Sequence, residues 1–248
     1  MNYNIYFSPT GGTKKVTSLV SEQFSAVKDI DLSLIEDFSQ YEFNQDDFCI
    51  IGVPSFGGRV PAIAIERLAM MKAHQTPVCM IVTYGNRAYE DTLLELKDTL
   101  KQQGFLPFSA MACVCEHSIM HQFGQGRPNQ QDQQQIIQFT QNIKERLTKE
   151  LIEIEVPGQR PYKEYHGIPL KPTASKKCIE CGICAKSCPV QAIDIKHPQQ
   201  TDKDKCMSCM RCIAVCPTHA RKNNSVLLAA SVQKLKKACQ QAKENELF

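Results

Sequence analysis

The stretch CIECGICAKSCP (residues 178–189) carries four cysteines in twelve residues. The stretch CMSCMRCIAVCP (residues 206–217) repeats the same C-x2-C-x2-C-x3-C-P spacing 28 positions further on, so eight of the 13 cysteines lie in two short runs. Three cysteines two residues apart let one tight loop wrap three corners of an iron–sulfur cube, and a further thiolate completes the ligand set. The alternatives are disulfides, which a reducing compartment disfavours, and zinc, which normally takes pairs of cysteines separated by a longer spacer.

The repeat closely resembles the bacterial-type ferredoxin with two 4Fe-4S clusters, over about residues 170–222. The segments CPVQAIDI and CPTHARKN are similar to the halves of that family's internal repeat, although Arg221 replaces the usual apolar residue. In this family the fourth cysteine of each run binds the cluster of the other run. The resemblance therefore implies a small α+β domain with one cluster on Cys178, Cys181, Cys184 and Cys216, and the other on Cys206, Cys209, Cys212 and Cys188. So small a segment should fold only with its clusters bound.

The first 150 residues alternate between strand-like and helix-like stretches. Apolar, β-prone runs predict strands at 3–7, 30–35, 47–54 and 77–84, and a fifth strand within 105–118. Apolar residues at helical spacing predict helices at 13–27, 61–72, 88–104 and 130–149. The alternation predicts a doubly wound, five-stranded parallel sheet with helices on both faces. Only eleven residues (36–46) separate the second and third strands, so we expect that crossover to be short or irregular.

Three loops follow the first, third and fourth expected strands, at the sheet edge where ligands bind in such folds. The loop SPTGGT (8–13) places hydroxyls and glycines before a helix, which suits a phosphate monoester, although such turns also simply cap helices. The loops PSFGGRVP (54–61) and TYGNRAYED (83–91) offer glycines and aromatic rings that suit a flat ligand. The expected contacts are Ser8, Thr10, Gly11, Gly12, Thr13, Ser55, Phe56, Gly57, Gly58, Thr83, Tyr84, Gly85, Asn86 and Tyr89.

The stretch FSPTGGT is similar to the flavodoxin phosphate loop, T/S-x-T-G-x-T, at Ser8, Thr10, Gly11 and Thr13. This resemblance covers about residues 1–150, and it implies an FMN whose phosphate lies in that loop and whose ring lies between the other two. Because the chain has no tryptophan, Phe56 or a tyrosine is expected to stack on the flavin. The whole chain resembles the flavodoxin–ferredoxin fusion proteins of anaerobes.

The rest of the chain completes a division into 1–150, a linker at 151–174, the cluster segment 175–222 and a C-terminal helix at 223–248. The loop after the fifth strand carries His117 and His121, which either donate protons to a flavin or are ordinary loop residues. Arg59 and Arg87 either place positive charge near the flavin or lie on a solvated rim. Five cysteines at no ligand spacing should be buried as small apolar residues: Cys49, Cys79, Cys113, Cys115 and Cys239.

Charge and hydropathy limit the choice of partners. The formal net charge of +3 divides into −4 for residues 1–150 and +7 for residues 151–248. The basic lysines are scattered and lack interleaved aromatics, so we expect a solvated face and no nucleic acid. No signal peptide and no run of 18 apolar residues is present, so we expect a cytoplasmic protein without a membrane span.

These observations favour one function over two alternatives. The resemblance implies an electron carrier that passes low-potential electrons between two 4Fe-4S clusters, an FMN and redox partner proteins, and a homodimer is possible. The first alternative is a flavin-dependent reductase of a small molecule fed by the clusters, and the second is a binding module with purely structural clusters. The sequence offers no acid/base pair or nucleophile constellation, which favours the carrier.

Overall fold

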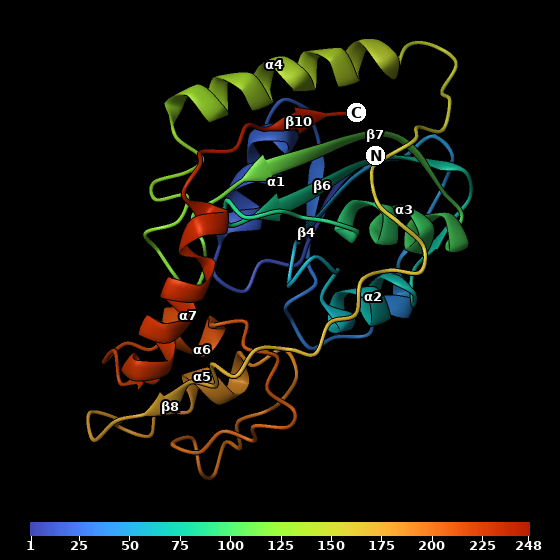
Figure 1. Cartoon of the computed structure of the whole chain (residues 1–248). Helices are drawn as coiled ribbons and strands as arrows, with labels where there is room; N and C mark the ends of the chain where they lie inside the picture. The colour runs from blue at the N-terminus through green and yellow to red at the C-terminus, as the bar shows by residue number, and fades with distance from the viewer.

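The computed structural model describes all 248 residues, and its main sheet lies between two helical layers (Figure 1). The sheet has six strands in the order β10-β7-β6-β4-β1-β2. Five are parallel: β1 (Asn2–Tyr6), β2 (Val27–Asp31), β4 (Phe48–Pro54), β6 (Thr76–Tyr84) and β7 (Phe105–Val114). This confirms the expected five-stranded parallel sheet. The C-terminal strand β10 (Glu246–Leu247), which the sequence did not indicate, adds antiparallel to β7.

Each face of the sheet is covered by two helices. Helices α1 (Gly12–Ser21) and α4 (Gln130–Arg146) pack with one apolar cluster, whereas α2 (Ala62–Leu68) and α3 (Thr92–Gln102) pack with the other. Neighbouring residues of β4 pack on opposite faces of the sheet. Ile50 belongs to the first cluster and Ile51 to the second, and both are fully buried. Burial on both sides explains why the parallel strands read as continuous apolar runs.

The crossover after the second strand is irregular, as expected. It contains a 3-10 helix (Phe38–Gln40) and the two-residue strand β3 (Glu42–Phe43), which pairs with β5 (Lys72–Ala73) in a separate small sheet. The expectation of a strand at 30–35 is wrong in its position, because pairing with β1 fixes the register of β2 at Val27–Asp31. Leu34 and Ile35, which suggested the later strand, are 47% and 54% exposed.

The cysteine-rich segment repeats its backbone conformation as well as its sequence. Helix α5 (Ile183–Lys186) has its counterpart 28 residues later in α6 (Arg211–Ala214), and the short strands β8 (Thr173–Ala174) and β9 (Arg221–Lys222) pair antiparallel. Positive φ angles recur with the same offset at Glu180 and Ser208, at Gly182 and Met210, and at Gln191 and His219. The two halves are therefore structural copies of one loop, as the resemblance implied. We call residues 173–222 the cluster module.

The linker lies along α3. The N–H groups of Gln159 and Lys163 donate to the two carboxylate oxygens of Asp91, at 2.8 and 2.7 Å. The Lys97 ammonium lies 2.9 Å from a carboxylate oxygen of Glu153. Such contacts hold the linker against the domain instead of leaving it free.

The C-terminal helix is shorter than the expected 223–248. Helix α7 (Ser225–Cys239) ends because the chain beyond it bends toward the sheet and forms β10 (Figure 1). The side chain of Asn86 takes part in this turn: its amide donates to the carbonyls of Cys239 and Gln241, at 2.7 and 3.1 Å. None of the helices combines the length and apolar character that crossing a membrane requires.

Candidate functional site

The first loop places free N–H groups at the start of a helix. Gly11 is the N-cap of α1 and has a φ of 92°, a left-handed conformation that favours glycine. The Ser8 hydroxyl accepts the N–H of Lys14 at 2.9 Å, which closes the loop. The N–H groups of Thr10, Gly12 and Thr13 donate to no protein acceptor. Unpaired donors at a helix start, with the helix dipole behind them, are suited to a phosphate group.

Hydroxyl groups join the three loops at the carboxyl edge of the sheet. The Thr13 and Thr83 hydroxyls lie 2.8 Å apart and are buried, and they connect the first loop to the third. The Ser55 N–H donates to the Thr83 carbonyl at 2.8 Å, and the Ser55 hydroxyl lies 2.7 Å from that of Thr92. The structure therefore brings Ser8, Thr13, Ser55 and Thr83 to one edge, although the hydroxyls of Ser55 and Thr83 are used inside the protein.

The second loop is a tight turn that needs both of its glycines. Phe56 and Arg59 exchange backbone hydrogen bonds of 2.9 and 3.2 Å, and Gly57 and Gly58 between them have φ angles of 64° and 94°. Two central residues with positive φ are typical of a type I′ turn. Arg59 does not stay free, because its guanidinium forms a pair with Glu95 at 2.6 Å.

An unexpected aromatic side chain covers this turn. A methyl group on Gly57 would lie 2.5 Å from Cδ2 of Tyr165, so the Tyr165 ring packs directly on the glycine. Burial raises the pKa of this tyrosine. Sequence reasoning missed Tyr165 because it sits in a polar linker. The only sequence signal for an aromatic residue at this site was Tyr165 itself, shortly before Gly167, in a chain that has no tryptophan to take this role.

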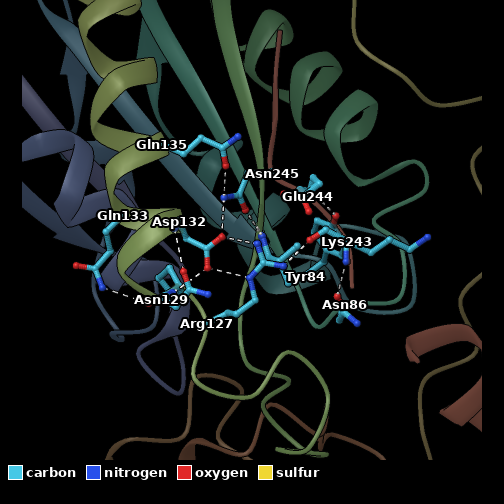
Figure 2. A network of polar contacts seen from close by, with 12 residues as sticks. Tyr84, Asn86, Arg127, Asn129, Asp132, Gln133, Gln135, Lys243, Glu244 and Asn245 are labelled. Carbon is cyan, nitrogen blue, oxygen red and sulfur yellow. Dashed lines mark hydrogen bonds and ion pairs between the residues drawn. The ribbon is translucent and has the colours of Figure 1, made fainter. Parts of the chain in front are cut away.

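Three residues of the third loop contact the C-terminal segment, and Figure 2 shows two of them, Tyr84 and Asn86. The Tyr84 hydroxyl donates to the Glu244 carbonyl at 3.2 Å, and burial raises the pKa of Tyr84 to about 12. Asn86 accepts the N–H of Lys243 at 3.0 Å, and the Tyr89 hydroxyl donates to Glu246 at 2.9 Å. Partners more than 150 positions away occupy the polar groups of these side chains. The Tyr84 side chain is buried, whereas stacking by Tyr89 and contacts from the backbone N–H of Asn86 remain predictions.

A buried ion pair fastens the same C-terminal segment (Figure 2). Arg127 pairs with Asp132 and donates to the Lys243 carbonyl. Asn245 donates to Asp132 at 3.0 Å and accepts the N–H of Val114 at 2.9 Å. Burial by itself would raise the pKa of Asp132, but Arg127 and the capping N–H of Asn129 hold it below its usual range. The network ties β10 to the end of β7 and to the start of α4.

His117 lies at the third loop, whereas His121 does not. A methyl group on Gly85 would lie 2.5 Å from Cδ2 of His117, so the imidazole covers this glycine. Its Nδ1 accepts the N–H groups of Ile119 and Met120 at 3.1 and 3.3 Å, which leaves the proton of the neutral ring on Nε2. Burial lowers the pKa of His117 to about 4, so the ring is neutral at pH 7. His121 is exposed and pairs with Glu116 at 2.8 Å.

Four thiols of the cluster module line one cavity. They are the expected ligands of the second cluster: Cys188, Cys206, Cys209 and Cys212. Burial, together with the nearby thiols of Cys188 and Cys206, raises the pKa of Cys209 to about 11. No three His, Cys, Asp or Glu side chains are placed to hold a single metal ion.

The remaining four expected ligands lie nearer the surface. Cys181 is exposed, Cys178 and Cys216 are half-buried, and Cys184 is buried. The same N–H···S bond occurs in both halves of the repeat: Ala192 donates to Cys188 and Ala220 donates to Cys216, each at 3.3 Å. Hydrogen bonds of this kind help to set the potential of an iron–sulfur cluster. The five other cysteines are all buried, as expected.

Arg221, the departure from the family repeat, has a structural use. It is 3% exposed, and its guanidinium donates to the Thr201 hydroxyl at 2.6 Å and to the carbonyl of Pro198. An apolar residue at this position would leave both acceptors without that donor. The arginine therefore fastens the loop around 198–201 to β9.

A family profile described as "4Fe-4S dicluster domain" matches residues 177–220. No curated protein sequence matches the chain significantly. Solved structures with a similar fold include oxidised flavodoxin 1 from Bacillus cereus, at 14% identity and a TM-score of 0.43, over 58% of this chain and 97% of that chain. Another is the rubredoxin oxygen:oxidoreductase from the anaerobe Desulfovibrio gigas, at 15% identity and a TM-score of 0.43, over 59% of this chain and 36% of that chain.

The strand order supplies the fold assignment independently of those likenesses. Numbered along the chain, the five parallel strands stand in the order 2-1-3-4-5, which is that of the flavodoxin-like fold. The cysteine repeat and the family profile identify the second part. The chain thus joins a flavodoxin-like α/β domain to a 4Fe-4S dicluster domain, which is a domain type for two clusters. This combination indicates electron transfer with redox partners.

Proposed function

We propose that this chain is an electron carrier that binds FMN at the carboxyl edge of its sheet and exchanges electrons between the flavin, two 4Fe-4S clusters and a partner protein. The observation that carries the proposal is the first loop. Three unpaired N–H groups, from Thr10, Gly12 and Thr13, meet the start of α1 directly after the first strand of a flavodoxin-like sheet. A flavin phosphate matches both their charge preference and their place in the fold.

The residues present fit an FMN, but the roles of several loop residues differ from those expected from the sequence. Ser8, Thr10, Gly11, Gly12 and Thr13 would hold the phosphate. Phe56 would border the ring together with Tyr165 and His117, which cover Gly57 and Gly85, while Glu90 lies against Gly58. Ser55 and Thr83 would lie behind them. Tyr84, Asn86 and Tyr89 would instead hold the C-terminal segment that supports the third loop. When bound, FMN supplies a centre that takes up one or two electrons.

The cluster ligands would be divided as the repeat implies. Cys206, Cys209, Cys212 and Cys188 would hold one cluster, and Cys178, Cys181, Cys184 and Cys216 the other. Covalent connection to the flavodoxin-like domain raises the effective concentration of the clusters near the flavin. The thiolate ligands require reducing surroundings, which supports a place in the cytoplasm of an anaerobe.

A reductase that transfers electrons from the flavin to a small molecule is the alternative function. The observation in its favour is His117, a neutral imidazole with an Nε2 proton that lies on Gly85 of the third loop. Such a group can donate a hydrogen bond to a flavin or to a substrate.

Cofactor analysis tests the proposal. Protein purified without oxygen should contain about eight irons and one FMN per chain, as two four-iron clusters and one flavin site require. Zinc in place of iron would reject the clusters. A fully iron-loaded protein that takes up no FMN in an equilibrium titration would reject the flavin site.

A further inference from the structure

The flavodoxin-like domain touches the cluster module beside three ligands of one cluster. Arg67 of α2 is 7% exposed, and its guanidinium donates to the Pro189 carbonyl at 2.8 Å, next to Cys188. Met207, next to Cys206, packs against the large apolar core of the flavodoxin-like domain. Met210, next to Cys209, is 3% exposed in a smaller apolar cluster with Ile119, Met120, Phe123, Leu170 and Cys239. All three contacts adjoin the ligands expected for the second cluster.

The start of the first cysteine run, unlike its end at Cys188 and Pro189, is open to solvent. Cys181 is exposed, and the neighbouring Ile179 and Ile183 are 65% and 40% exposed. Two copies of one loop therefore differ in their surroundings, with one buried against the domain and the other open to solvent.

Met210 marks the difference between the copies most sharply. Its counterpart 28 residues earlier is Gly182, and both have positive φ, 63° for Met210 and 72° for Gly182. A residue with a side chain is strained in this conformation, whereas glycine is not. The side chain of Met210 belongs to the apolar cluster that includes the loop after β7, and its sulfur accepts a hydrogen bond from the Asn223 amide at 3.2 Å.

That loop connects Met210 to the proposed flavin site. The His117 N–H donates to the Phe123 carbonyl at 2.9 Å, which closes residues 117–123 into one unit. Ile119, Met120 and Phe123 of this unit belong to the cluster around Met210, while His117 covers Gly85 of the third loop. Residues 117–123 therefore link the apolar cluster that contains Met210 to the edge where the flavin ring is proposed to lie.

We infer that the cluster on Cys188, Cys206, Cys209 and Cys212 is the one that exchanges electrons with the flavin, and that the other cluster receives them from the partner. This order rests on the proposed function. A reduced one-electron donor, such as another iron–sulfur protein, loses one electron to the outer cluster, which passes it to the inner cluster and then to the flavin. Two such passages, with two protons from solvent, reduce the flavin fully.

Hydrogen exchange tests the contact without any flavin. Met210→Gly should keep its full iron content, because glycine already occupies the equivalent position 182. Amide exchange across residues 117–124 should become about tenfold faster, which corresponds to about 1.4 kcal/mol of lost docking. Ile179→Ala, an exposed change in the first run, should leave that exchange unaltered. Unchanged exchange in Met210→Gly, or equal acceleration in Ile179→Ala, would overturn the proposed contact.

Rapid-mixing spectroscopy with reduced methyl viologen then tests the order of transfer. Flavin reduction in the FMN-loaded wild-type protein should be faster with iron than without it, and Met210→Gly should lose most of this difference while Ile179→Ala retains it. Retention of the whole difference in Met210→Gly would contradict the order. Failure of the wild-type protein to bind FMN would instead defeat the proposed function and leave the exchange result standing.

Discussion

The flavodoxin-like domain and the cluster module differ most in what fills their interiors. The two apolar clusters on the faces of the sheet hold 22 and 12 buried residues, whereas the module's own apolar cluster holds three, Cys184, Ala185 and Ile193. Burial of apolar surface is the main term that stabilises a fold, so the first region has a source of stability that the second lacks. The comparison predicts that one part of the chain is stabilised by its side chains, and that the other depends on bound clusters for its stability.

The largest effect should come from removing iron. Chelation should unfold residues 177–220 and leave the parallel sheet intact, because only the module depends on metal for its core. Hydrogen exchange resolved by peptide measures both regions in one experiment. A module that stays protected without iron would contradict the comparison, and so would a sheet that unfolds with it.

Truncation of a core side chain should instead destabilise the flavodoxin-like domain and leave the cluster module unaffected. Ile51→Ala in the central strand removes a fully buried side chain and should lower the free energy of unfolding of the domain by about 2–5 kcal/mol. Urea denaturation followed by circular dichroism measures this loss. Leu34→Ala, at a side chain that is 47% exposed, serves as the control and should change the midpoint little. Equal losses in the two variants would show that the interior of the sheet does not dominate stability.

A smaller effect is expected at the first loop. Thr10→Val removes an exposed hydroxyl beside the unpaired N–H groups and should weaken FMN binding about tenfold or more, since a hydrogen bond to a charged group contributes about 1.5–3 kcal/mol. Quenching of flavin fluorescence measures the dissociation constant. Thr10→Ser keeps the hydroxyl and should bind nearly as well as the wild-type protein. Unaltered affinity in Thr10→Val would remove this residue from the phosphate site.

The smallest effect is a pH dependence from His117. Burial lowers its folded-state pKa to about 4 from a usual value of 6.5, so the unfolded chain binds more protons between these values. Stability is therefore complete above pH 6.5 and falls as the pH drops toward 4, by on the order of 1 kcal/mol between pH 7 and pH 5. Urea midpoints at the two pH values measure the difference. His117→Gln should reduce it and His121→Gln should not; equal reductions would exclude His117 as its source.

Much of the fold could be predicted because its causes are local in the sequence. Strands buried on both faces appear in the sequence as apolar runs, and the helices between them appear as amphipathic stretches. The glycines and hydroxyl residues of the first loop indicate its position. The cysteine repeat is clearer still, because its spacing follows from the shape of the object that it binds. Even so, the second strand was misplaced, since Leu34 and Ile35 are apolar but exposed.

The parts that escaped prediction depend on partners far away along the chain. Tyr84, Asn86 and Tyr89 have the residue types of a ligand loop, and nothing near them in sequence reveals that Lys243, Glu244 and Glu246 bind them. A two-residue strand such as β10 has no periodicity to detect. Tyr165 is similarly hidden in a polar linker, where only docking along α3 brings it to Gly57.

One anaerobic redox titration tests the central claim most directly. The protein loaded with iron and FMN would be reduced stepwise while visible spectra follow the clusters and the flavin together, with iron-free protein as the reference. The account predicts that electrons supplied to the clusters bleach the flavin absorbance, and that after each addition of reductant this absorbance settles sooner than in the iron-free protein. Clusters that become fully reduced while the flavin absorbance stays unchanged would contradict it.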